Sequence, residues 1–398
     1  MRLLEHQAKR LIAGFGVSFT EAQVVEDPLA ARAAALALGR AAVLKAQVPF
    51  GGRGKAGAVK FAATADEAEA AARELLAMKL HGQPVTRISV EPKIDFRREF
   101  YAGMAWDTAA KRPVALLSEA GGTEVESAAR VVKRPFDPWT GLGAFEGREM
   151  AAELGLAGRP LGGIGQILAQ VSRAFLASDA LTLEVNPLVE LADGGLLGLD
   201  AHVETDDDAG FRQQATLDRL GVAATGADGG RPPTPLELEA QRIDAMDHRG
   251  VAGRVVEFDG NLGLLIGGGG ASLTVFDAIR RHGGRPANYC EVGGNPTEEK
   301  VAALTALLLS KPGVRQLAVI MNVVNNTRAD VMARGVLAGV RRAGGEPARV
   351  ITVFRIPGSW EQEAHDLLAA AGIEALGRKV SLDEAARLAV QRSFSHVT

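Results

Sequence analysis

Two polar side chains stand two residues apart in the apolar segment LTLEVNPLV. On a strand, Glu184 and Asn186 point to the same face, and Asp200 ends the next apolar segment, LLGLD. A carboxylate and an amide on one face of an apolar strand require a partner that satisfies them. Mg²⁺ is such a partner, since it prefers hard oxygen ligands at about 2.0–2.1 Å and completes its shell with phosphate and water. We therefore interpret this group as a metal site, the alternative being a solvent-facing polar edge.

A glycine-rich loop follows Lys45, which lies in a segment that reads as a strand. The loop contains the glycines Gly51, Gly52, Gly54 and Gly57 and the cations Arg53 and Lys55. Glycines let backbone N–H groups approach a phosphate, and nearby cations offset its charge. The spacing is not that of a Walker loop. A phosphate-binding loop and a tight hairpin with solvated cations both fit this segment.

Two glutamates flank a charged loop further along. Glu91 ends one predicted strand and Glu99 opens the next. Carboxylates at strand ends can accept hydrogen bonds from a ribose or an adenine amino group. The alternative is that both glutamates are simply solvated.

A second glycine-rich segment, GLLIGGGGASLTVF, contains Gly267, Gly268, Gly269 and Gly270. It reads as a strand, a glycine turn and a helix, and the N-terminus of a helix attracts anions. A plain strand-to-helix turn is the alternative. The dinucleotide fingerprint is not met, because no acidic residue ends the next strand at a suitable spacing, which disfavours a nicotinamide enzyme.

The elements that must position these groups fall into two halves with different rhythms. In the first half, the face formed by Leu3, Leu4, Gln7, Leu11 and Ile12 predicts a helix that Gly14 ends. Predicted strands cover 41–48, 58–62, 87–91, 98–106, 113–119, 130–136, 181–191 and 195–204, with helices from Thr64 to Lys79 and over 148–179. This pattern indicates a mixed α+β region with a strong antiparallel component.

The second half alternates strands and helices regularly. Strands are predicted at NLGLLI, ANYCEV, LAVIMNVV and ARVITVF, and a helix follows each of them. Such alternation predicts a doubly wound parallel sheet. Residues 224–236 are rich in Gly, Pro, Asp and Thr and suit a linker, so we predict domains at 1–232 and 233–398.

Bulk properties indicate a globular protein. The chain has 45 basic and 48 acidic residues, a net charge of −3 and one cysteine, Cys290. The charge balance argues against a protein that coats nucleic acid or a membrane surface, and a single cysteine excludes an intramolecular disulfide. The first residues lack the apolar core of a signal peptide, and no segment approaches the about 20 apolar residues of a membrane span. We expect a cytoplasmic protein.

Motifs along nearly the whole chain resemble the β subunit of succinate–CoA ligase. They are EHQAKRLIAGFGV, LKAQVPFGGRGKAG, VEPKIDFRREFYAG, DPWTG, GREMAAELGL, LEVNPLV, LDA and RHGGRPANYCEVGGNPTEEKV. The resemblance implies an ATP-grasp fold in the first half and a flavodoxin-like CoA-ligase domain in the second. It also implies an ADP-forming ligase of the tricarboxylic acid cycle type, which joins a dicarboxylic acid such as succinate to CoA. Phosphate would pass from ATP to a histidine of an α subunit, then to the acid, and CoA, bound mainly by α, would displace it.

By the same resemblance, individual residues acquire roles. Nucleotide contacts fall on Lys45, Gly52, Arg53, Gly54, Glu91 and Glu99, the Mg²⁺ ligands on Asn186 and Asp200, and the glutamate that orients the phosphohistidine on Glu184. The run from Gly267 to Gly270 corresponds to the start of the helix that points at this phosphohistidine. None of the seven histidines of this chain lies in a motif resembling the phosphorylated one, so we expect an αβ or α2β2 assembly.

The sequence departs from the family pattern where the acid is handled. The family's asparagine at the helix start is replaced by Gly267, and the glycine-rich N-I-F-G-G-I-V-R-C-D becomes a shorter segment containing Asn325, Asn326 and Thr327. The usual Gly-Lys after Asp200 is Ala201-His202. We expect an acid other than succinate, such as malate, another hydroxylated dicarboxylate or a sulfonated short acid. Two other classes stay open, a non-catalytic nucleotide-binding paralogue and a stand-alone ATP-grasp carboxylate–amine ligase.

Overall fold

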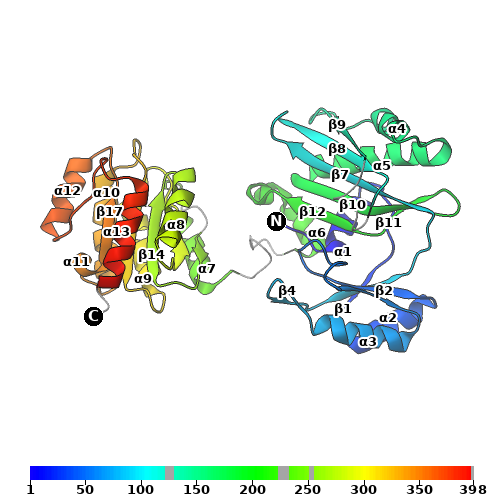
Figure 1. Ribbon diagram of the computed structural model, residues 1–398, viewed down its shortest axis with the longest axis horizontal. Helices are drawn as coiled ribbons and strands as arrows, with labels where there is room; N and C mark the ends of the chain where they lie inside the picture. The colour runs from blue at the N-terminus through cyan, green and yellow to red at the C-terminus, as the bar shows by residue number, and fades with distance from the viewer. Residues whose placement is uncertain (122–129, 223–232, 251–254, 396–398) are drawn as a thin grey trace. The chain divides into compact units, whose positions relative to one another are not determined.

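The computed structural model describes residues 1–121, 130–222, 233–250 and 255–395. It forms two compact units, Met1–Pro232 and Pro233–Thr398 (Figure 1). Most of the predicted linker, 224–232, lies outside the described residues. Its last part is wrong as a linker, because Thr234 accepts a hydrogen bond from the Glu237 N–H at 3.3 Å and caps helix α7 (Pro235–Asp244).

Unit 1 contains two larger antiparallel sheets and a two-stranded antiparallel pair, β4–β5. Its strands are β1 (Gln23–Val25), β2 (Ala42–Ala46), β3 (Val59–Ala62), β4 (Lys79–Leu80), β5 (Gln83–Pro84), β6 (Ile88–Pro92), β7 (Arg98–Asp107), β8 (Arg112–Ser118), β9 (Val131–Pro135), β10 (Ala180–Glu190), β11 (Leu196–Gly198) and β12 (Ala201–Thr205). Its helices are α1 (Glu5–Ala13), α2 (Pro28–Leu38), α3 (Ala65–Leu76), α4 (Ala144–Glu153), α5 (Gly158–Ala177), the 3₁₀ turn η2 (Asp207–Ala209) and α6 (Gly210–Leu220).

The smaller sheet has the order β1-β6-β2-β3 and carries helices α2 and α3 (Figure 1). Helix α2 was not predicted, although Asp27 caps it by accepting from the Ala30 N–H at 2.8 Å and Gly39 ends it in a left-handed conformation. Its buried residues are alanines, so the apolar period that reveals a helix is weak there. This sheet presents Lys45 on β2 and Glu91 on β6.

The larger sheet has the order β11-β10-β7-β8-β9, with β12 also paired to β10. Helices α4 and α5 pack on it. The helical stretch predicted over 148–179 is confirmed as two helices, because the chain turns at Gly155, which has a positive φ, before α5 begins at Gly158, whose φ is also positive. The last predicted strand of this half is likewise interrupted, so that Asp200 lies between β11 and β12.

Unit 2 has a parallel sheet of order β14-β16-β17. Its strands are β13 (Val256–Glu257), β14 (Leu262–Gly267), β15 (Asn288–Tyr289), β16 (Gln316–Met321) and β17 (Ile351–Arg355). Its helices after α7 are α8 (Gly270–Arg281), α9 (Glu298–Ser310), α10 (Ala329–Arg342), α11 (Pro347–Val350), α12 (Glu361–Ala370) and α13 (Leu382–Ser395). Separate apolar clusters join the sheet to α8 and α13 and to α9, α10 and α12, which confirms a sheet covered on both faces.

Two predicted strands of unit 2 are shorter than expected. In ANYCEV, β15 covers two residues and pairs antiparallel with β13, while Glu291 forms an isolated parallel bridge with Ile266. In ARVITVF, the first residues belong to α11.

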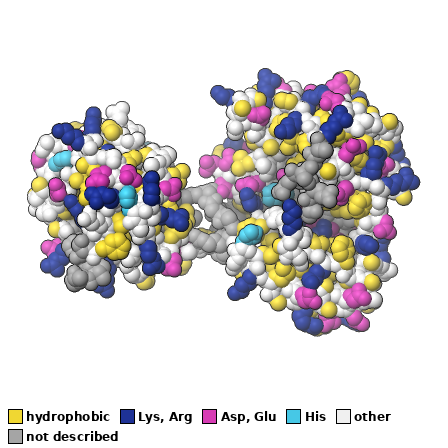
Figure 2. Space-filling model, viewed as in Figure 1, with side chains coloured by type: hydrophobic (Ala, Val, Ile, Leu, Met, Phe, Trp, Pro, Cys, Tyr) yellow, Lys and Arg dark blue, Asp and Glu magenta, His cyan; other side chains and the backbone are white. Residues whose placement is uncertain are grey.

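Figure 2 shows acidic and basic side chains intermixed over the viewed face of each unit, in keeping with the nearly balanced composition.

Candidate active site

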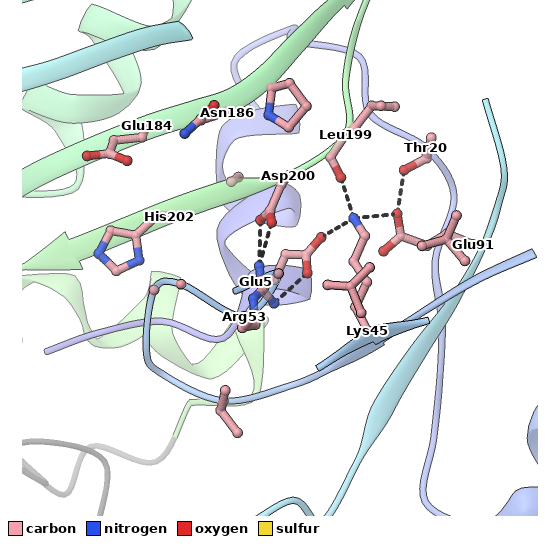
Figure 3. Close-up of a pocket in the computed structure, with 18 of the residues that line it drawn as sticks. Glu5, Thr20, Lys45, Arg53, Glu91, Glu184, Asn186, Leu199, Asp200 and His202 are labelled. Carbon is pink, nitrogen blue, oxygen red and sulfur yellow. Dashed lines mark hydrogen bonds and ion pairs between the residues drawn. The ribbon is translucent and has the colours of Figure 1, made fainter. Parts of the chain in front are cut away.

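A cavity of about 720 Å³ lies in unit 1, and most of the predicted nucleotide and metal residues line it. The predicted residues among its lining are Lys45, Gly52, Arg53, Gly54, Glu91, Glu184, Asn186 and Asp200. They come from β2, the loop after it, β6, β10 and the β11–β12 connection (Figure 3). The fold therefore gathers segments that are up to about 150 residues apart in the chain.

Lys45 stands at the centre of a buried ionic network. Its Nζ donates to Oε1 of Glu5 at 2.8 Å, to the carbonyl oxygen of Leu199 at 2.6 Å and to Oε2 of Glu91 at 3.3 Å. Burial disfavours its charge, but Glu5, Glu91 and Asp200 outweigh burial and raise the pKa of Lys45. The ammonium is thus charged at neutral pH.

Glu5 on α1 contacts all three cations of this network, and it was not predicted from the sequence. Its carboxylate accepts from Lys45, from Lys9 at 2.7 Å and from Arg53 at 2.5 Å. Burial alone would raise its pKa, but the three cations hold the pKa of Glu5 well below its usual range. The available signal was a glutamate and a lysine four residues apart on one helix, Glu5 and Lys9.

Glu91 is enclosed by protein partners. Its Oε2 accepts from Lys9 and from the Thr20 hydroxyl, both at 2.7 Å, and its Oε1 accepts from the Ser89 hydroxyl at 3.0 Å. Glu91 is 2% exposed. In this structure its carboxylate holds cations that border the cavity, whereas the sequence predicted an acceptor for a ribose or an adenine amino group, or else a solvated glutamate.

Glu99, the other glutamate predicted to contact a nucleotide, lies outside the cavity lining. It lies on β7 opposite Val189, is half-buried, and is absent from the residues that line the cavity. Strand β7 runs between β10 and β8 in the larger sheet, whereas Glu91 belongs to the smaller one. The two glutamates, although close in sequence, therefore belong to different sheets.

Glu184 and Asn186 both face the cavity from β10, as the strand period predicts (Figure 3). The Asn186 N–H donates to the carbonyl oxygen of Asp200 at 3.1 Å, which places the two predicted metal ligands side by side. Glu184 pairs with His202 across the β10–β12 ladder. Burial lowers the pKa of His202, so its imidazole is neutral at neutral pH.

The glycine-rich edge of unit 2 is the segment Gly267–Gly270, which was predicted to present backbone N–H groups to an anion. Gly268 and Gly269 have φ angles of 112° and 60°, and α8 begins at Gly270, the residue after them. However, the Gly269 N–H donates to Oε1 of Glu291 at 2.7 Å, and the Tyr289 hydroxyl donates to Oε2 at 2.9 Å. A carboxylate of the chain itself thus takes up a donor at the helix start.

The predicted Asn-Asn-Thr segment divides into exposed and buried parts. Asn325 and Asn326 are exposed, whereas Thr327 is buried and its Oγ1 accepts from the Asn295 N–H at 3.1 Å. The Ser359 hydroxyl donates to the carbonyl oxygen of Asn325 at 2.5 Å. The two asparagines therefore present amides at this edge, while Thr327 holds the loop to its neighbour.

Comparisons with known proteins agree with this architecture. A family profile described as an ATP-grasp domain matches residues 2–190, and one described as the citrate-binding part of ATP citrate lyase matches residues 231–354. The ADP-forming succinate–CoA ligase subunit β of Chloroflexus aurantiacus is 37% identical and aligns over 93% of each chain. The corresponding subunit of Rubrobacter xylanophilus is 35% identical over 98% of each chain.

The chain belongs to the succinate–CoA ligase β-subunit family. The family includes a GDP-forming subunit from Thermus thermophilus, 36% identical and covering 92% of this chain and 93% of its own. The structure of ATP citrate lyase from Methanothrix soehngenii with citrate and coenzyme A is 20% identical and has a TM-score of 0.72 over 98% of this chain and 99% of its own. These findings confirm an ATP-grasp half followed by a CoA-ligase-type domain.

The cavity's oxygen donors fit the Mg²⁺ that accompanies nucleotides in this family. The Asp200 carboxylate and the Asn186 amide are hard ligands, and Mg²⁺ takes few protein ligands when phosphates supply the rest. Over the described parts of the chain, no three His, Cys, Asp or Glu side chains gather into a metal site. A cation there would therefore need phosphate or water oxygens as well.

In the same described parts, no helix has the length and apolar character to cross a membrane.

Proposed function

We propose that this chain is the nucleotide-binding β subunit of an ADP-forming acid–CoA ligase. The reaction converts ATP, a short dicarboxylic acid and CoA into acyl-CoA, ADP and phosphate. The observation that carries the proposal is the grouping of Lys45, the glycine loop and the Asn186–Asp200 pair around one cavity, with Glu184 beside them. The relatives named above support the same reaction type.

In this proposal the chain's residues divide the work of phosphoryl transfer. Lys45 and the Gly52–Gly54 loop bind the phosphates, Asn186 and Asp200 hold Mg²⁺, and Glu184 orients a histidine of the α subunit. Mg²⁺, when bound, would neutralise charge on the phosphate oxygens. The histidine nitrogen attacks the γ-phosphorus, the bond to the β,γ-bridging oxygen breaks, and ADP leaves.

The second half of the reaction consumes the phosphohistidine. A carboxylate oxygen of the acid attacks phosphorus and releases the histidine, giving an acyl phosphate. The CoA thiolate then attacks the acyl carbon and phosphate leaves, so each bond formed is matched by one broken. CoA is bound mainly by the α subunit in this scheme, and the edge near Gly267–Gly270 faces the phosphohistidine.

We further propose that the acid is not succinate. Support comes from the exposed Asn325 and Asn326 amides, where the family pattern has glycines, because such amides can pair with a hydroxyl or sulfonate. Purified chain and its cognate α subunit should be assayed with ATP, CoA and a panel of acids. The expected result is a higher kcat/KM for a hydroxylated or sulfonated acid, and a clear preference for succinate would contradict it.

Two variants test whether the amides of Asn325 and Asn326 set this preference for the acid. N325G and N326G remove the two amides, and we expect the ratio of kcat/KM values to shift towards succinate by about tenfold, as loss of one or two substrate hydrogen bonds does. K45M should abolish turnover with every acid. An unchanged ratio in the glycine variants would place acid selection elsewhere. ATP is the expected nucleotide, and GTP in the same assay tests this.

A further inference from the structure

Arg53 bridges two carboxylates that come from distant parts of unit 1. Its Nη1 donates to Oε2 of Glu5 at 2.5 Å, and its Nη2 donates to both carboxylate oxygens of Asp200 at 2.7 Å (Figure 3). The Arg53 side chain is 10% exposed and that of Asp200 is 28% exposed. The guanidinium therefore lies on the cavity-facing oxygens that a metal would use.

The charges around this contact balance one another. The network contains three cations, Lys9, Lys45 and Arg53, and three anions, Glu5, Glu91 and Asp200. Of the three anions, Glu5 and Glu91 are almost fully buried, and Asp200 is the one that solvent reaches. A divalent cation that approaches Asp200 thus meets a guanidinium already in place, and this six-residue network offers it no surplus negative charge.

The loop that carries Arg53 has glycine backbone and open space around it. Gly52 and Gly57 have positive φ angles of 75° and 70°, and Gly51, Gly52 and Gly57 have no heavy atom within 4 Å of an added Cβ. The residues on either side of Arg53 are exposed, whereas Arg53 itself reaches into the cavity. Open space and glycine backbone allow the loop to shift when the partner of Arg53 changes.

We propose that Arg53 makes the site select a metal–nucleotide complex over a free divalent cation. In the absence of nucleotide, Arg53 stays on Asp200 and excludes the metal. When the complex arrives, its phosphates take the Nη2 donor, Glu5 keeps the Nη1 donor, and the carboxylate of Asp200 becomes available to the metal. Glu5 is then a positioning residue, because it holds the guanidinium of Arg53 while the Nη2 donor changes its partner. This inference rests on the proposed nucleotide site.

Binding of Mn²⁺ to the full chain without nucleotide tests the proposal. Free Mn²⁺ is followed by electron paramagnetic resonance in the wild type, R53Q, R53K and K55Q. We expect R53Q to bind Mn²⁺ at least about tenfold more tightly than the wild type, since a cation on the ligand is removed, and R53K to gain less. K55Q neutralises a charge in the same loop and should leave the affinity within about threefold of the wild type, as expected for an exposed charge.

The proposal requires that the tighter Mn²⁺ binding of R53Q depends on Asp200. It also requires that the same substitution weakens binding of the metal–nucleotide complex. R53Q/D200N should lose the extra Mn²⁺ binding, and R53Q should bind Mg²⁺–ADP more weakly than the wild type. An equal gain in K55Q, or no gain in either R53Q or R53K with the variants folded by circular dichroism, overturns the exchange. If the wild type then still binds Mg²⁺–ADP, the proposed function stands and only the exchange is wrong. Failure of the wild type to bind Mg²⁺–ADP overturns both.

Discussion

The cavity of unit 1 and the glycine-rich edge of unit 2 each place a charged side chain of the protein where a ligand is proposed. In unit 1 the charge is positive, since Arg53 lies on Asp200. In unit 2 it is negative, since Glu291 accepts from the Gly269 N–H. Each ligand site is therefore electrostatically satisfied by the chain itself, and a ligand must compete with that partner.

The two regions reach this state by different means. The cavity depends on side chains from α1, β2, β6 and the β11–β12 connection, which are buried together. The edge depends on backbone geometry, because positive-φ glycines bring the start of α8 close to Glu291. Loss of a side chain should therefore damage unit 1 most, and an added Cβ should damage the edge of unit 2.

The largest effect is expected from removing a buried ammonium in either unit. K45M leaves Glu5 and Glu91 short of a cation, which should lower the free energy of unfolding of unit 1 by about 3–5 kcal/mol and abolish ADP binding. In unit 2, Lys300 is fully buried and donates to the carbonyl oxygens of Asp244, Asp247 and Arg249. K300M should therefore destabilise unit 2 by about 3 kcal/mol and leave ADP binding intact. Urea unfolding and calorimetric titration with Mg²⁺–ADP measure the two effects.

The comparison fails if K300M abolishes ADP binding under conditions where unit 1 is folded, or if K45M retains it. K55Q is a suitable control, since it removes a lysine from an exposed position beside the cavity. Its effect on the free energy of unfolding should be below about 1 kcal/mol.

A smaller effect is expected from adding a methyl group to neighbouring glycines of the unit 2 edge. At Gly268, φ is 112° and an added Cβ would lie 2.9 Å from Cβ of Asn322, so G268A should destabilise the unit by about 1–3 kcal/mol. Gly270 has no heavy atom within 4 Å of an added Cβ and begins α8. G270A should stabilise by about 0.5 kcal/mol. Thermal unfolding of both variants distinguishes them, and equal effects would refute a role for backbone geometry.

The smallest effect concerns an ion-paired carboxylate near the same edge. Arg328 and Arg334 donate to Asp330 at 2.7–3.0 Å and lower its pKa below the ordinary value. Because the folded pKa is depressed, the stabilisation is present above about pH 4, the ordinary pKa, and is lost as pH falls through the folded value. D330N should cost about 1 kcal/mol near pH 7.

That difference between D330N and the wild type should shrink as pH falls below about 4, because Asp330 is then protonated first in the unfolded chain and, at lower pH, in the folded protein. Urea unfolding of both proteins between pH 3 and pH 7 measures it. A difference that stays constant to the lowest pH, or grows there, would contradict the ion-pair account.

Much of the fold follows from local sequence patterns. Alternating apolar residues predicted β7, β8 and β10, and the apolar runs predicted β14 and β16, because these strands pack one or both faces into a core. Helix α2 was not predicted because its buried face is made of alanines. The interruption of the strand at Asp200 was not predicted because the apolar pattern continues across the break.

The site was only partly predictable, because its ionic partners lie far apart in the chain. The strand period placed Glu184 and Asn186 on one face, and Lys45 was recognised from its loop. Glu5 contacts Lys45 over 40 residues, and Arg53 contacts Asp200 over 147, so no local pattern encodes either pair. Glu99 and Glu91 lie on different sheets for the same reason, since the sheet to which a strand belongs is a tertiary property.

Phosphoryl transfer to a partner histidine tests the central claim most directly. The chain, its cognate α subunit, Mg²⁺ and ATP labelled at the γ-phosphate should be mixed without acid or CoA, and the label located by acid-labile, alkali-stable phosphate on each separated subunit. The account predicts label on a histidine of the α subunit that requires this chain and is lost in D200N. Label on this chain alone, or turnover of acid by this chain without any α subunit, would contradict it.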